Sequence, residues 1–346
     1  MKSPMLKKTI KNVFYTLVVC SVFSVTAQSP VAAIQSKLAS KNLLVDITLA
    51  GSTLIAVGER GHILLSSDGE QWQQANVPVN VLLTSVDFKN DKVGFATGHD
   101  ATLLKTTDGG FNWSVSNYQP ELDKPLLDVK VIGDNVIAVG AYGLFLQSFD
   151  AGQTWQDSFQ DELLIEDDRL YLNDLKEYEP DVYQKEKQFM LPHFNNINVV
   201  GEQLFIAGEA GFLAKSDKDG EDWQIIETDY FGSYFSIINV DDSQFLAGLR
   251  GNLFKSEDQG DSWQALDTGV KATINSAYHY KNVTYFFANS GNIFYTSNNT
   301  DINDYELDDG KAVMSGVVFN GFLYLATEAG IKKIALSEFT SNKARD

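Results

Sequence analysis

A seven-fold repeat with a period of about 40 residues constrains the fold more than any other feature. Each unit contains a tight loop of the form G-x-x-G, followed by an apolar run that ends in Ser or Thr. Clear copies of the loop start at positions 58, 140, 208 and 248, and weaker copies start at 98, 288 and 327. The starts lie 40, 42, 68, 40, 40 and 39 residues apart, so one interval holds an insertion of about 28 residues. A repeat of about 40 residues is typical of one propeller blade.

A second motif, S/T-x-D-x-G-x-x-W, follows the loops at a fixed distance, and residues 148–155 are its clearest copy. Ser and Asp side chains bond the backbone of turns, Gly allows a positive φ, and Trp offers a large apolar surface. All five tryptophans end a copy, and residues 296–305 are read as an eroded one. We interpret the motif as a structural turn that locks a hairpin onto the next blade. Its assigned residues are Asp68, Trp72, Asp108, Trp113, Asp150, Trp155, Trp223, Asp258 and Trp263.

Each unit reads as four short strands, and the third unit shows them best, at 128–132, 135–139, 144–148 and 154–159. These runs are rich in β-branched or aromatic residues and are bounded by Gly, Asn and Asp. Seven such units that close radially form a β-propeller, which leaves only short strand edges. The sequence therefore predicts an all-β, seven-bladed propeller of four-stranded antiparallel blades, as one domain over residues 28–346.

Closure of the ring is the least determined part of this prediction. The seventh unit has three predicted strands but no turn-and-tryptophan strand. We expect residues 30–42 to supply the missing outer strand of this blade. The alternative is that residues 338–341 complete the blade locally.

The insertion between blades 3 and 4 spans residues 157–194 and carries eleven acids and four bases. Leu164, Tyr171, Leu175 and Tyr178 fall on one face of a predicted helix. Pro180 is expected to end that helix, and the remainder is expected to be loop.

Charge and the first residues bound the compartment and the partners. The net charge of −19 argues against nucleic acid and against anionic membrane surfaces. Residues 1–27 have a basic start, an apolar run and small residues before Ala27, so they predict a signal peptide cleaved after Ala27. An uncleaved anchor and a lipoprotein attached at Cys20 remain alternatives. We expect a monomer in the periplasm or secreted medium, with no insertion into the membrane after cleavage.

Catalytic, metal and cofactor motifs are not apparent. The turns also recur in bacterial neuraminidases, but sialidase chemistry needs converging arginines, and only Arg60 and Arg250 lie on blades. A carbohydrate-active enzyme with a carboxylate pair stays open as the alternative, and such a pair across a deep central pocket would favour it. Residues 217–222 resemble a calcium loop, but they fall in register with the turn motif and are expected to form a turn. We expect no cofactor and no metal.

The period, the turns and the export signal together resemble the photosystem II stability/assembly factor family. The resemblance covers about residues 43–336, and its most specific part is the loop and turn at 98–113. It implies a non-enzymatic, exported seven-bladed propeller that holds membrane-protein intermediates during assembly. The family carries arginines in its G-x-R-G loops, which this chain matches at Arg60 and Arg250. The corresponding positions elsewhere are Asp100, Tyr142, Ala210, Ser290 and Ala329.

A protein-binding face follows from this topology. In a propeller, the loops between strands two and three share one end with the connections between blades. The insertion is therefore expected to rise beside Tyr142 and Glu209. Its tyrosines, amid carboxylates, are expected to dock a basic surface of a membrane or envelope protein. The expected partner-binding residues are Arg60, Asp100, Tyr142, Glu209, Arg250, Tyr171, Tyr178 and Tyr183. A scaffold or assembly factor is thus predicted, and a structural envelope protein is a weaker alternative.

Overall fold

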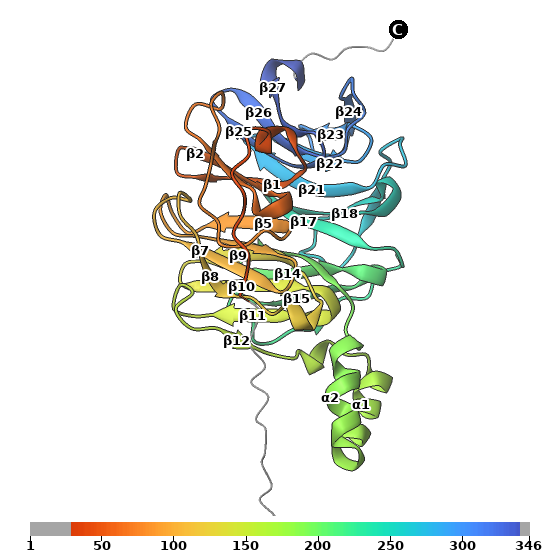
Figure 1. The fold of residues 1–346 in the computed structure, drawn as a ribbon. Helices are drawn as coiled ribbons and strands as arrows, with labels where there is room; N and C mark the ends of the chain where they lie inside the picture. The colour runs from red at the N-terminus through yellow and green to blue at the C-terminus, as the bar shows by residue number, and fades with distance from the viewer. Residues whose placement is uncertain (1–28, 340–346) are drawn as a thin grey trace, which may run out of the picture.

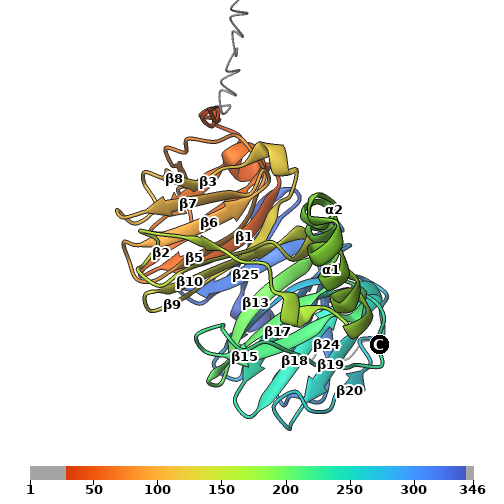
Figure 2. The same ribbon diagram turned by 90° about the horizontal axis from the view of Figure 1, so that it is seen from below.

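Seven antiparallel sheets make up the computed structural model, which describes residues 29–339. The first strand of each sheet contacts the first strand of the next, and the contact between β1 (Leu44–Ala50) and β25 (Val313–Phe319) closes the ring. Figure 1 shows the blades in order of colour along the chain, and Figure 2 shows several first strands toward the middle. The predicted seven-bladed propeller is confirmed. The predicted signal peptide lies outside the described residues.

The strands follow the repeat. Blades 1 to 3 contain β1, β2 (Thr53–Gly58), β3 (Ile63–Ser66), β4 (Gln73–Gln74); β5 (Leu83–Phe88), β6 (Gly94–Gly98), β7 (Thr102–Thr106), β8 (Ser114–Asn117); β9 (Leu126–Ile132), β10 (Asn135–Gly140), β11 (Phe145–Ser148), β12 (Gln156–Asp157). Blades 4 to 7 contain β13 (Phe194–Val200), β14 (Gln203–Gly208), β15 (Leu213–Asp217), β16 (Gln224–Ile225); β17 (Tyr234–Val240), β18 (Ser243–Gly248), β19 (Leu253–Ser256), β20 (Gln264–Leu266); β21 (Ile274–Tyr280), β22 (Val283–Ala288), β23 (Asn292–Thr296), β24 (Asn303–Glu306); β25, β26 (Phe322–Thr327), β27 (Gly330–Ala335).

The seventh blade has three strands in the described chain, so the expectation that residues 30–42 supply its outer strand is wrong. The alternative segment 338–341 lies partly outside the described residues, which end at 339. Residues 30–42 form no strand; Ala33 N–H donates to Val77 O at 3.0 Å along the outer edge of blade 1. Residues 336–339 form a 3-10 helix instead of a strand. Its Phe339 packs against Tyr285, Tyr295 and Tyr305 of blade 6, with ring centroids 5.1–5.3 Å away. Phe339 thus belongs to the buried cluster that fills the space between blades 6 and 7.

The two glycines of each G-x-x-G loop are required by close approaches of backbone or neighbouring side chains. A Cβ on Gly140 would lie 2.2 Å from Pro125 O, at the start of the same blade. A Cβ on Gly143, whose φ is 69°, would lie 2.5 Å from Leu191 Cβ in the connection to the next blade. The loop therefore fits tightly between the two connections that flank its blade.

The third residue of the four-residue loop adopts a left-handed backbone in six of the seven loops, although it is never glycine. Ser290 has a φ of 58° and is exposed. Because this conformation is strained for residues with a Cβ, Ser290→Gly should raise the free energy of unfolding by about 0.5–1 kcal/mol. Gly291→Ala, at a φ of 75° beside Leu307, should do the opposite. Chemical denaturation of both variants checks this, and a loss of stability in Ser290→Gly would contradict it.

The S/T-x-D-x-G-x-x-W turns are joints between blades, as predicted. Asp150 Oδ1 accepts hydrogen bonds from the N–H groups of Gln153 and Thr154 at 2.9 and 2.8 Å. Gly152 lies so close to Phe95 of the preceding blade that a Cβ would approach its ring to 2.3 Å. Trp155 meets the same ring edge-on at 5.9 Å. Each turn therefore fixes its own hairpin and also packs on the blade before it.

Departures from the motif are accommodated by neighbouring residues. In the fourth copy, Asp217 accepts from Gly220 N–H at 3.0 Å and so takes the role that Lys218 cannot fill. In the eroded sixth copy, Asn298 accepts from the N–H groups of Thr300 and Asp301 at 3.1 and 2.9 Å. The expectation that residues 217–222 form a turn is confirmed.

The insertion is more helical and more buried than predicted. The expected helix is α1 (Glu166–Tyr178), but Pro180 also begins a second helix, α2 (Pro180–Glu186), where loop was expected. The buried face is formed by Leu172 and Leu175, whereas Tyr171 and Tyr178 are exposed. Figure 1 shows both helices projecting from the blades.

Leucines of the insertion complete the core between blades 3 and 4. Leu163, Leu164 and Leu191 are buried in one cluster with Phe145 and Phe194 of these blades. Deletion of residues 160–190, which we would expect from the sequence to leave the propeller intact, would therefore expose this core.

Candidate partner-binding surface

One end of the propeller carries the G-x-x-G loops, the connections between blades and the insertion. The insertion lies beside Tyr142 and Glu209, as the topology predicts. The Tyr142 ring meets Phe189 edge-on at 5.3 Å and His193 at 4.5 Å. His193 Nδ1 lies 3.6 Å from Glu209 Oε2. The end of the insertion is therefore fixed against the loops of blades 3 and 4.

A buried lysine strengthens this junction. Lys124 Nζ donates to the Gln188 carbonyl and lies 5.5 Å from the centroid of the Tyr142 ring and 5.2 Å from that of Phe189. Burial lowers the pKa of Lys124, while the charge of Asp157 raises it. Tyr142, which was predicted to contact a partner, thus also holds the insertion in place.

The other predicted loop residues are separated around the ring. Arg60 and Arg250 are both exposed, but they lie in blades 1 and 5 and do not form a basic patch. Arg60 Nε faces Glu59 Oε1 at 3.9 Å. Asp100 is half-buried and accepts a long hydrogen bond from Tyr118 OH at 3.5 Å. The structure therefore does not gather the five predicted loop residues into one site.

The three tyrosines of the insertion differ in their accessibility. Tyr178 is 72 % exposed and Tyr171 is 46 % exposed, so both are available to a partner. Tyr183 is half-buried, with Lys176 Nζ at 5.8 Å and Lys187 Nζ at 5.3 Å from its ring centroid. Tyr183 therefore serves the packing of α1 on α2 more than a free surface.

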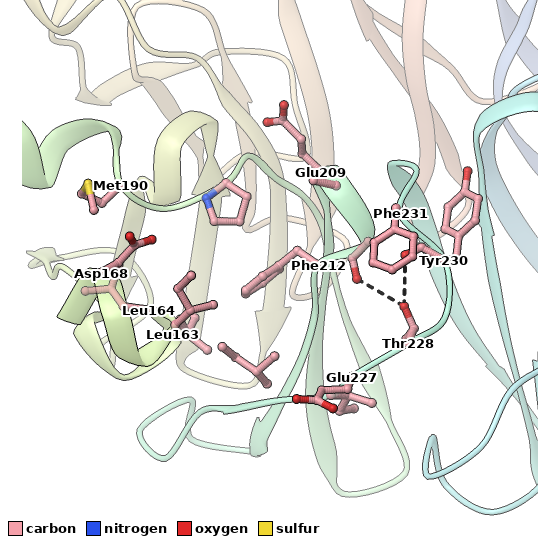
Figure 3. A pocket seen from close by; sticks show the side chains of 16 residues that line it. Leu163, Leu164, Asp168, Met190, Glu209, Phe212, Glu227, Thr228, Tyr230 and Phe231 are labelled. Carbon is pink, nitrogen blue, oxygen red and sulfur yellow. Dashed lines mark hydrogen bonds between the residues drawn. The ribbon is translucent and has the colours of Figure 1, made fainter. Parts of the chain in front are cut away.

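Sequence reasoning missed an apolar groove of about 510 Å³ between the insertion and the connection from blade 4 to blade 5. Figure 3 shows Leu163 and Leu164 on one side, Phe231 and Thr228 on the other, and Phe212 between them. Phe231 is 86 % exposed, the highest value among the large hydrophobic side chains of residues 29–339. The sequence indicated this groove only through two adjacent aromatic residues, at 230 and 231, in a connection between blades.

The central channel contains the buried carboxylate pair that would have favoured an enzyme. Asp46 and Asp128 both accept a hydrogen bond from the Ser85 hydroxyl, at 3.3 and 2.7 Å. Asp46 also accepts from Val86 N–H, and Asp128 from Ile197 N–H, each at 2.9 Å. Their oxygens thus bond backbone groups of neighbouring blades. The pair thus joins neighbouring blades around the channel.

Burial, with a smaller contribution from the nearby charge of Asp46, raises the pKa of Asp128 to about 6 against the hydrogen bonds that lower it. The folded protein therefore holds this proton more tightly than the unfolded chain between pH 3.8 and about 6, and its unfolding free energy falls as pH rises through that window.

We expect the stability of the wild type relative to Asp128→Asn to fall by about 2–3 kcal/mol between pH 4 and pH 7. Denaturation of both proteins across this range measures the difference, and the Asn side chain at position 128 does not itself titrate. A difference that stays constant, or that grows with pH, would contradict the assignment.

Residues 29–339 contain no helix long and apolar enough to cross a membrane. Within that range, no three His, Cys, Asp or Glu side chains converge in an arrangement that could hold a metal ion.

Comparison with known proteins agrees with the repeat. Residues 64–165 match the family model for the photosynthesis system II assembly factor YCF48. The chain resembles a photosystem II assembly factor. Nothing among the curated proteins matches the sequence significantly.

Solved structures support the fold of this YCF48-like propeller. "YCF48 bound to D1 peptide" is 15% identical with a TM-score of 0.64, over 89% of this chain and 99% of that one. YCF48 from Cyanidioschyzon merolae is 14% identical with a TM-score of 0.64, over 90% and 100% of the two chains. The WD40 propeller domain of Doa1 is 10% identical with a TM-score of 0.62, over 88% and 95%. At these identities the structures establish the propeller fold.

Proposed function

We propose that the protein is a non-enzymatic, exported scaffold that binds another protein through the end of the propeller that carries the insertion. The observation that carries this proposal is the accumulation of exposed apolar side chains at that end. Five of them are Tyr142, Ile165, Tyr178, Phe189 and Phe231. Contiguous exposed apolar surface on a folded protein marks interaction sites. The family match and the peptide-bound YCF48 structure support a protein as the ligand.

The proposed partner is a membrane or envelope protein that is being assembled. Support comes from the resemblance to an assembly factor and from the predicted export signal. The acidic insertion suits a basic partner surface, because opposite charges speed encounter.

Capture of partners by the intact protein tests this function. The double variant Tyr171→Ser, Tyr178→Ser should lose partners that the wild type retains in cross-linked extracts of the native host. Phe111→Ser combined with Phe149→Ser is the matched control, since both rings are about half exposed at the opposite end. Equal recovery by both double variants would contradict the proposed face.

Export itself predicts a mature chain that starts at Gln28. Intact-mass measurement of protein from the native host checks this. A mass that still includes Cys20, with or without lipid, would contradict cleavage after Ala27.

A further inference from the structure

The groove beside the insertion is bounded by two connections between blades. Leu164 and Ile165 form one wall, at the start of the insertion. Thr228 and Phe231 lie on the opposite side, in the connection from blade 4 to blade 5, and Phe212 lies between the two sides (Figure 3). The volume of about 510 Å³ lies within the range of about 300–1,000 Å³ that is usual for ligand pockets.

Hydrogen bonds and ring packing fix both walls. The Thr228 hydroxyl accepts from Tyr234 OH at 2.9 Å and donates to Tyr230 O at 3.3 Å, which positions the connection that carries Phe231. Glu162 Oε1 accepts from Trp223 N–H at 3.1 Å, which ties the opposite wall to blade 4. These hydrogen bonds hold both sides of the groove in place, so binding would need little rearrangement.

Its charged groups all have one sign. Asp168, Glu209 and Glu227 are the charged side chains among the described residues that line the groove, and no Lys or Arg lines it. The floor and walls between them are apolar. A complementary ligand therefore has an apolar centre and positive charge on either side.

We propose that this groove binds a peptide segment of the partner protein that carries large apolar side chains flanked by Lys or Arg. The inference rests on the proposed function and specifies its ligand. Buried aromatic and aliphatic anchors supply most of the affinity at interfaces, while charges at the rim set orientation and association rate. A second copy of the chain is a poor occupant, because its net charge of −19 repels the acidic rim.

Fluorescence anisotropy with short labelled peptides tests the groove directly. The parent peptide has a Leu and a Phe between two Lys pairs; one derivative replaces the apolar residues with Ser, and another replaces Lys with Glu. The full-length mature protein should bind the parent peptide at least about tenfold more tightly than either derivative. Phe231→Ser should weaken the parent peptide to a similar degree. Phe111→Ser, at the opposite end, should leave its affinity unchanged.

A charge exchange separates recognition from folding. Glu227→Lys should weaken the parent peptide and strengthen the Glu derivative, which no structural defect would produce. Asp91→Lys at the opposite end is the control. Failure of the parent peptide to bind, equal affinity for all three peptides, or a dimer that Phe231→Ser dissociates would overturn the inference. If partner capture survives Phe231→Ser but is lost with the two tyrosines of α1, the groove assignment fails while the proposed function stands.

Discussion

Trp223→Ala is expected to lower the free energy of unfolding by about 3–5 kcal/mol, the usual loss when a buried Trp becomes Ala. Trp223 is 4 % exposed, meets Phe145 of the preceding blade at 6.1 Å, and donates from Nε1 to Gly220 O at 3.0 Å. The substitution would leave a cavity at the joint between blades 3 and 4 and remove this hydrogen bond. Equilibrium denaturation in urea measures the change.

Trp155 and Asp150 provide graded comparisons at the equivalent joint between blades 2 and 3. Trp155 is only partly buried and its Nε1 has no partner among the described residues, so Trp155→Ala should cost less than Trp223→Ala. Hydrogen bonds from the Thr154 side chain and backbone lower the pKa of Asp150, which shows that the turn stabilises its charged form. Asp150→Ala should give the smallest loss of the three. Equal, negligible losses for all three variants would contradict the role of the turns as joints.

Phe339→Ala is expected to cost about 3–5 kcal/mol, because it removes a buried aromatic ring from the cluster between blades 6 and 7. Phe339 is 6 % exposed and contacts three tyrosine rings of blade 6. Since blade 7 has no fourth strand in the described chain, it has no turn between strands three and four that could pack on blade 6. Denaturation followed by tyrosine fluorescence reports on the same region.

Glu338→Ala is the matched control for Phe339→Ala. Glu338 accepts an exposed hydrogen bond from Tyr305 OH at 3.1 Å, so its loss should change stability by less than about 0.5 kcal/mol. Similar stability of both variants would contradict the role of Phe339 at the joint between blades 6 and 7.

The repeated elements of the fold were predictable because each is determined locally. A turn such as 148–155 needs its Ser, Asp and Gly for its own backbone, so its six copies reveal six of the blades without knowledge of their contacts. The closure of the ring was not predictable in this way. The ring closes through contacts of β1 with β25, and the adjoining joint between blades 6 and 7 uses Phe339, a residue outside the repeat that no local pattern connects to the three tyrosines of blade 6.

The binding surface was predictable in position but not in detail. Topology alone placed the insertion beside Tyr142 and Glu209, as the contacts of Phe189 and His193 confirm. The helix of the insertion was predicted, but its buried face was assigned to the wrong residues. The spacing of Tyr171 suggested a buried position, whereas the structure buries Leu172 and exposes Tyr171. The groove depends on how the two connections lie against each other, which spacing along the chain does not determine.

Photo-cross-linking from both ends of the propeller tests the central claim most directly. A cross-linking amino acid would replace Tyr178 or Phe231 at the insertion-bearing end, and Phe111 or Phe149 at the opposite end, in the native host. We predict covalent adducts with the same partner protein from the first pair and none from the second. Adducts from the opposite end alone, or from neither end, would contradict the account of this propeller as a scaffold that binds proteins through its insertion-bearing end.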